Sequence, residues 1–246
     1  MTFTAHENIQ TPSGETMIWR YMDFTKFLSF IDKQASFFCR ADFMDDRYEG
    51  SLSAATLDPL RMWDMVMDYY GTQMANDASE RAQTSIKNHF LNCWHMNNYE
   101  SAAMWKVFAK TNEAIAIQSR VWRLKSSFNN IRPNIYVGRV KYVDYDVDKI
   151  PNEEPLLAYF HKRKSFEYEQ ELRAVFVNDP NTQSYDSSLL EKPGLYFHSY
   201  IESLIESVYV APESPLWFRD LVKSVTTKYG LEVNVINSRL DETPVY

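Results

Sequence analysis

The chain has 246 residues, of which 45% are hydrophobic and 15% aromatic, and its net charge at neutral pH is −7. This apolar content is ample for a packed core and excludes a disordered or low-complexity chain. The acidic balance disfavours sequence-independent binding of nucleic acid, because such binding depends on lysines and arginines that displace counterions from the phosphates.

No apolar run approaches the roughly 20 residues of a membrane-crossing helix, and residues 1–14 lack the basic and apolar regions of a secretion signal. The two cysteines, Cys39 and Cys93, are too few for a disulfide framework. Both stand in apolar, strand-like segments and fit small core residues, although a disulfide between them stays open. We therefore expect a cytoplasmic protein without a membrane segment.

In the first part of the chain, the spacing of apolar residues predicts strands that alternate with helices. The expected elements, in chain order, are a strand over 17–21, a helix over 24–31 capped by Asp23, a strand over 36–40, an acid-rich loop over 41–51, a long amphipathic helix with apolar residues from 60 to 74, and a more polar helix to about 88. The last two helices form a helical insertion over about 57–88.

The remaining sequence predicts further strands and helices in irregular order. The expected elements are a strand over 90–96, a helix over 103–108, a strand over 113–119, a helix over 121–128, a strand over 136–145 interrupted by Gly138, a helix over 156–164, a strand over 174–177, an exposed loop over 178–194, a strand over 207–211, a helix over 215–229 and a strand over 232–236. This pattern predicts an α+β fold, with a mixed β-sheet core, flanking helices and the helical insertion, as a single domain over 1–246. Two domains divided near residue 130 remain the alternative.

The most informative stretch is 162–173, where three bases and then three acids precede the apolar run 174–177. Glu169, Glu171 and Arg173 have the same parity, so they converge at the entrance of a strand if this run is one. Charges beside a core need partners that offset their desolvation. The stretch therefore predicts either an active site or a structural network of salt bridges.

The structural interpretation of these charges needs no ligand. Lys162 and Arg163 would neutralise the acids around a helix-to-strand junction, and Arg20 would pair with Asp42 or Glu49. In the functional interpretation the same charges surround a ligand, and both interpretations stay open.

Six short sequence segments, spread over nearly the whole chain, form a specific combination. They are Trp19-Arg20-Tyr21-Met22-Asp23, Arg40-Ala41-Asp42 with Glu49-Gly50, Asn92-Cys93-Trp94-His95, Glu100-Ser101-Ala102-Ala103-Met104-Trp105, Lys162 with Glu169-Gln170-Glu171-Leu172-Arg173, and Tyr209-Val210-Ala211-Pro212. In combination they resemble a widespread bacterial domain of unknown function (DUF 2971 type), some of whose relatives stand near abortive-infection proteins of the AbiGi type. The resemblance implies a phage-defence or toxin-like setting and carries no established activity.

Arg20, Ser101, Glu169 and Glu171 also follow one another in an order similar to that of ADP-ribosyltransferases of the Arg-Ser-Glu type. This resemblance implies that Arg20 holds NAD, Ser101 sets the nicotinamide half, Glu171 is the catalytic carboxylate and Glu169 activates the acceptor. The Ser-Thr-Ser strand motif of that family is missing. The other expected ligand-binding residues are Arg40, Glu100, Lys162 and Arg173. No cofactor other than NAD is indicated.

Two rival functions stay open. The first is a metal-dependent nuclease whose acidic loop, together with Glu169 or Glu171, holds Mg²⁺. The loop acids are Asp42, Asp45, Asp46 and Glu49. Their spacing matches no EF-hand, and we assign no metal ligand. The second is a non-catalytic module that binds a partner protein or a nucleotide.

His95 and Cys93 form half of a zinc site at best, so we expect His95 to be a hydrogen-bonded core or pocket-wall histidine. The six glycines form neither a P-loop nor a dinucleotide fingerprint, and no Gly-x-Ser-x-Gly elbow is present. The familiar motifs of nucleotide-binding and serine hydrolase sites therefore do not assign a function.

Overall fold

The computed structural model of the chain describes residues 5–67, 74–109, 111–128 and 135–244. Its centre is a nine-stranded mixed sheet in which only β10 and β11 pair in parallel. The strands are β1 Met17–Asp23, β2 Ala35–Arg40, β3 His89–Met96, β4 Ala114–Arg120, β5 Ile135–Arg139, β8 Glu171–Val177, β9 Gly194–His198, β10 Ser207–Val210 and β11 Asn234–Asn237. The predicted α+β fold with a mixed sheet is confirmed.

The sheet divides at β3. One edge of β3 pairs with β8 along nearly its whole length. The other edge pairs with β2 only at residues 90–91 and with β1 only at residues 95–96. β1 and β2 therefore separate between these points, and residues 92–94 of β3 lie beside an opening in the sheet. From there β4, β10 and β11 extend the β1 side, and β9 extends the β2 side.

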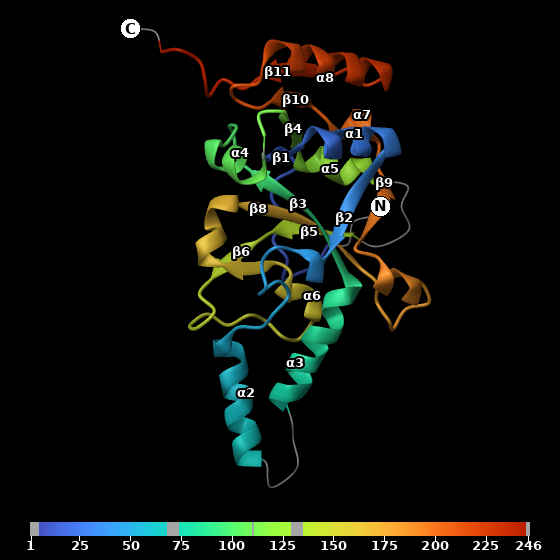
Figure 1. Cartoon of the computed structure of the whole chain (residues 1–246). Coiled ribbons are helices and arrows are strands. Elements are labelled where there is room, and N and C mark those ends of the chain that lie inside the picture. Colours follow the sequence, from blue (N-terminus) through green and yellow to red (C-terminus); the bar gives the residue numbers. More distant parts are fainter. Residues whose placement is uncertain (1–4, 68–73, 110, 129–134, 245–246) are drawn as a thin grey trace.

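Helices cover both faces of the sheet (Figure 1). On one face, the largest apolar cluster joins the sheet to α1 Phe24–Lys33, α5 Val121–Ser127, α7 Ile201–Leu204 and α8 Leu216–Lys228. On the other face, two smaller clusters pack around α4 Ala102–Phe108 and α6 Pro155–Ala158. Side chains of β1 and β3 alternate between these faces, because successive residues of a strand point to opposite sides.

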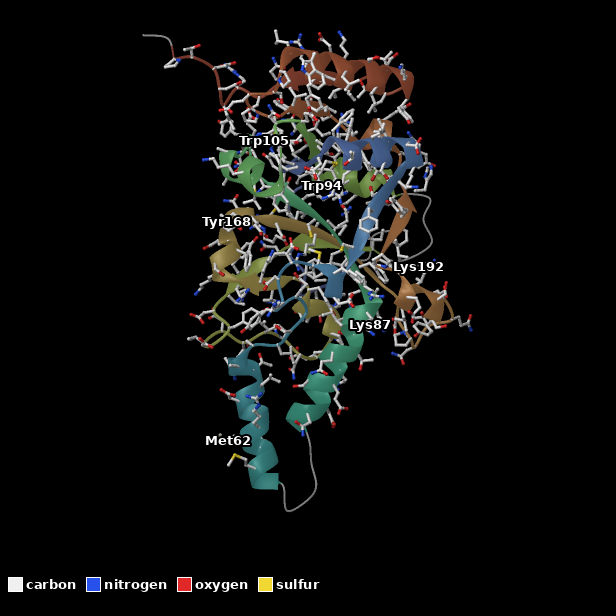
Figure 2. All side chains as sticks on the ribbon, viewed as in Figure 1. Met62, Lys87, Trp94, Trp105, Tyr168 and Lys192 are labelled. Atoms are coloured by element: carbon white, nitrogen blue, oxygen red, sulfur yellow. The ribbon has the colours of Figure 1, made fainter. Side chains whose placement is uncertain are left out.

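The helical insertion is a hairpin of α2 Ala54–Met67 and α3 Met74–Ser85, followed by the 3₁₀ turn η3 Ile86–Asn88. It projects from the body at the end opposite α8 (Figure 1). Figure 2 shows Met62 on the side of α2 that faces away from α3. Among the described residues, no helix is long and apolar enough to cross a membrane.

Of two predicted helices, one lies partly outside the described residues and the other is replaced in part by a strand that tertiary contacts hold. Of the long helix expected over 60–74, the described residues contain α2 up to Met67 and α3 from Met74, and Tyr70 lies outside them. The helix expected over 156–164 ends at Ala158. Its second half is the strand β7 His161–Arg163, which pairs with β6 Lys141–Val143 and buries Lys162 against two glutamates.

Three more boundaries were predicted wrongly. The strand expected over 136–145 breaks at Val140, whose N–H donates to the carbonyl oxygen of Glu171, and Gly138 lies within β5. The loop expected over 178–194 contains the 3₁₀ turn η5 Ser187–Glu191. β9, which begins at Gly194, follows it and was not predicted.

Candidate functional site

A pocket of about 490 Å³ opens where β1 and β2 separate from β3. Aromatic and apolar side chains form most of its wall, from α4 on one side to β2 on the other. The charged side chains among its described lining residues are Arg20, Lys26, Glu169 and Glu171. Three of these four residues belong to the site that the sequence predicted.

Arg20 lies on β1 at the opening of the sheet. Its Nη2 donates to the carbonyl oxygen of Phe37, 3.3 Å away, and its guanidinium lies 5.8 Å from the ring centre of Trp94. Trp94 itself is in the interior, as Figure 2 shows. No described carboxylate forms an ion pair with Arg20, so neither Asp42 nor Glu49 is its partner. Burial lowers the pKa of Arg20 to about 10, which leaves a cation without a counter-ion at neutral pH.

A buried network of charges lies on the other side of the pocket. Lys162 contacts Glu169 and lies 3.3 Å from Glu171, through Nζ and Oε1. Arg173 is fully buried; its Nε donates to Glu171 at 2.5 Å, and its two terminal nitrogens donate to Glu49 at 2.6 and 2.9 Å. The network therefore contains two cations and three carboxylates, and one carboxylate is in excess.

The excess carboxylate is Glu169. Burial raises its pKa, and the neighbouring charge of Glu171 raises it further. Burial alone would also raise the pKa of Glu171, but Arg173 and Lys162 outweigh that effect and lower it. A proton on Glu169 also supplies a hydrogen bond to Glu171. Two neighbouring carboxyl groups thus have pKa values displaced in opposite directions, which is how acid–base sites divide their roles.

A tight turn brings the two glutamates to the same lysine. The 3₁₀ turn η4 Lys164–Glu169 ends at Gln170, which has the left-handed conformation with φ of 40°. The carbonyl oxygen of Gln170 accepts from the N–H of Met96 at 2.9 Å. Glu169 therefore reaches Lys162 from the turn, while Glu171 begins β8, which explains how both converge at the strand entrance.

His95 is a pocket-wall histidine in the structure. Its Nδ1 lies 2.6 Å from the carbonyl oxygen of Glu169, so this nitrogen carries the proton and donates. Its Nε2 is buried and has no hydrogen-bond partner in the structure. Burial lowers the pKa of His95, which keeps the ring neutral.

The acidic loop does not collect its carboxylates around one point. Asp42 accepts from Arg40, Asp46 from Arg163, and Glu49 from Arg173. Within the described part of the chain, no group of three or more His, Cys, Asp or Glu residues is arranged to hold a metal ion. The arginines leave these acids little capacity to bind Mg²⁺.

Three residues expected at the site have other contacts, and none is among the described residues that line the pocket. Ser101 caps α4, because its hydroxyl accepts from the N–H of Met104. Glu100 accepts from Trp105, Ser238 and the N–H of Arg239. Arg40 holds Asp42 and the carbonyl oxygen of Leu190.

Some pocket residues were not predicted as functional. Cys39 and Cys93 are free thiols in the pocket wall, and burial raises both pKa values, so they are protonated. Glu49, outside the pocket lining, was expected in the acidic loop or as a partner of Arg20, whereas it binds Arg173. Glu49 and Arg173 are 124 positions apart in the sequence, so no local spacing indicates that they pair.

No protein-family model, no curated protein and no solved structure matches the chain. The resemblances to the bacterial domain of unknown function and to ADP-ribosyltransferases therefore remain predictions.

Proposed function

We propose that the pocket binds a nucleotide of the NAD type and cleaves the bond between nicotinamide and ribose, with transfer of ADP-ribose to an acceptor or to water. One observation carries this proposal: an arginine without a counter-ion and a pair of carboxyl groups with opposed pKa shifts line the same pocket.

The cationic side of the pocket suits a pyrophosphate. A buried guanidinium without a carboxylate gains most from an anionic ligand, and its fork can bind two phosphate oxygens. Lys26 adds a second cation at the rim, since its side chain is exposed and its Nζ lies 3.9 Å from its nearest acid, Asp23.

The walls and the size of the pocket suit a nucleotide ring. About 490 Å³ falls within the range of small-molecule sites. Trp19 and Phe108 on one side and Phe37 on the other offer surfaces for a flat ring. Aromatic surfaces of this kind favour a heterocycle over an open-chain ligand.

The acidic side suits cleavage of the glycosidic bond. When the C1′–N bond breaks, its electron pair passes to the nicotinamide nitrogen, and positive charge develops on the ribose. Glu171, held as an anion by Lys162 and Arg173, stabilises that charge. The acceptor oxygen then bonds to C1′, and its proton passes to the ionised form of Glu169, which is present near neutral pH because burial and Glu171 raise the pKa of Glu169 to about 7.

The resemblance to relatives of AbiGi-type proteins supports, as part of the same proposal, a defence or toxin setting in a bacterial cytoplasm. Ser101, Glu100 and Arg40 have no direct role in this proposal, because each is engaged elsewhere.

The test is thermal unfolding with and without NAD, with nicotinamide release followed in the same samples. We expect NAD to stabilise the protein, Arg20→Ala to weaken binding at least about tenfold, and Glu171→Gln to lower the release rate by on the order of a hundredfold. Arg219→Ala, at a partly exposed arginine on α8, is the matched control, and we expect it to leave NAD binding and nicotinamide release unchanged.

The remaining outcomes separate the rival functions. Stabilisation by NAD without nicotinamide release indicates a non-catalytic nucleotide-binding module. Stabilisation by Mg²⁺ alone, accompanied by cleavage of nucleic acid, indicates the nuclease. Absence of both NAD effects in the wild type overturns the proposal.

A further inference from the structure

His95 has one ring nitrogen fixed and the other available. The Nδ1–H donates to Glu169, so Nε2 carries a lone pair and acts only as an acceptor. Only 3% of the residue is exposed, and Nε2 lacks any partner in the described part of the chain. A buried acceptor without a donor is costly, so a ligand that supplies the donor gains affinity.

The position of His95 shows which part of the ligand it meets. In the β3–β8 ladder His95 is paired directly with Glu171, and on its other side it is paired with Trp19 of β1. Side chains at directly paired positions lie on the same face with Cβ atoms about 5 Å apart. A group that contacts Nε2 therefore lies next to the atom that Glu171 stabilises.

In the proposed reaction that atom is C1′ of the ribose. The atoms bonded to C1′ are the ring oxygen, the nicotinamide nitrogen and C2′. The first two carry no hydrogen in the bound nucleotide, whereas C2′ carries a hydroxyl group. The nearest hydrogen-bond donor to C1′ is therefore the 2′-hydroxyl.

We propose that His95 accepts a hydrogen bond from the 2′-hydroxyl of the scissile ribose and thereby selects ribonucleotides over their 2′-deoxy counterparts. This inference rests on the proposed function and adds a specificity residue that the ADP-ribosyltransferase resemblance does not assign. The hydrogen bond from His95 to the carbonyl oxygen of Glu169 also couples the ring to the end of the turn that precedes Glu171.

The experiment compares two probes that cannot be cleaved: carbocyclic NAD, in which a cyclopentane ring replaces the ribose that carries nicotinamide, and its analogue without the 2′-hydroxyl of that cyclopentane ring. Dissociation constants are measured by calorimetry for the wild type, His95→Phe and His95→Gln. We expect the wild type to bind the hydroxyl form about tenfold more tightly. His95→Phe is expected to bind both probes equally, whereas His95→Gln, whose amide can both donate to Glu169 and accept from the ligand, keeps a preference.

Each result decides between the claims. Equal binding of both probes by the wild type overturns the role of His95 and leaves the proposed function intact. A preference that persists in His95→Phe overturns it as well. Failure of the wild type to bind either probe overturns the proposed function and this inference with it. If His95→Phe does not fold, the test is the ratio of the two dissociation constants in the wild type and whether His95→Gln retains that ratio.

Discussion

Arg173 connects two buried carboxylates in the interior of the protein. It is fully buried, and it forms ion pairs with Glu49 on one side and with Glu171 on the other. Removal of one partner from such a pair leaves a buried charge uncompensated, which costs far more than the pair itself contributes. The structural and functional interpretations of these charges are therefore compatible, because Glu171 belongs both to the network and to the pocket wall.

Glu171→Gln and Glu49→Gln separate the two roles. Each leaves Arg173 with one carboxylate fewer, so we expect each to lower the free energy of unfolding by roughly 3 kcal/mol, measured by urea denaturation. Of these two glutamates only Glu171 lines the pocket, so only Glu171→Gln is expected to lower nicotinamide release by on the order of a hundredfold when both variants are assayed well below their unfolding temperatures. If folded Glu49→Gln also lost release, the network as a whole would be required rather than the pocket carboxylate.

Glu169 should make stability depend on pH. Its pKa in the folded state is raised above the ordinary value of 4.5 by burial and by Glu171. A carboxyl group with a raised pKa contributes full stability below its unfolded-state pKa and loses it as the pH rises through the folded-state pKa. Glu169→Gln resembles the protonated form and avoids that loss. We therefore expect the variant to gain stability over the wild type, by on the order of 1–2 kcal/mol, as the pH rises from about 4.5 towards neutral.

The measurement is urea unfolding of both proteins at several pH values across that window. Glu167→Gln, which removes an exposed acid from the same turn, is the control for loss of one negative charge. A stability difference that stays constant with pH would show that the pKa of Glu169 is not raised in the folded protein.

Among the elements, the loop between β2 and α2 depends most on one glycine. Gly50 follows Glu49, has φ of +70°, and a Cβ there would lie 2.4 Å from Cε1 of Tyr159. The hydroxyl of Tyr159 lies 3.0 Å from Oγ of Ser85 and its ring stacks on His89, so the ring cannot move freely away. The loop thereby delivers Glu49 to Arg173.

Gly50→Ala and Gly230→Ala test this geometry. Gly230 has φ of +72°, but nothing lies within 4 Å of its added Cβ. Both variants place alanine in the left-handed region, which costs about 1 kcal/mol. Only Gly50→Ala also meets a ring, so we expect its total loss of unfolding free energy to reach roughly 2–4 kcal/mol. If thermal or urea unfolding gave equal losses of unfolding free energy for the two variants, the ring of Tyr159 would move aside without an energetic cost.

The elements also show what local sequence predicts. The strands over 17–21 and 90–96 were found because each is an apolar segment with a buried pattern of its own. β7 was not found, because Lys162 is held there by glutamates that arrive seven and nine residues later. The alternation of side chains predicted that Glu169, Glu171 and Arg173 come together, because these residues are close in the sequence. The pairing of Arg173 with Glu49, rather than with another acid of the loop, depends on the fold.

At the scale of the whole molecule, the pocket lies where the two parts of the sheet separate. β1 carries β4, β10 and β11 on one side, and β2 carries β9 on the other. Arg20 of β1 and Asn92 of β3 both donate to the carbonyl oxygen of Phe37 on β2, at 3.3 and 2.8 Å. These two hydrogen bonds take the place of the backbone hydrogen bonds that the opening interrupts. We expect a ligand bound to Arg20 to stabilise them.

Ligand binding should therefore protect the backbone on both sides of the opening. We expect saturating NAD to slow amide hydrogen exchange in residues 20–23 of β1 and 36–39 of β2, because the opened forms that allow exchange are depopulated when ligand binds the closed form. The α2–α3 hairpin and α8, at opposite ends of the molecule and absent from the described pocket lining, serve as internal controls with unchanged exchange. Arg20→Ala should remove the protection of β2 together with that of β1. Protection confined to one strand would place the ligand on one part of the sheet and contradict a site that bridges the opening.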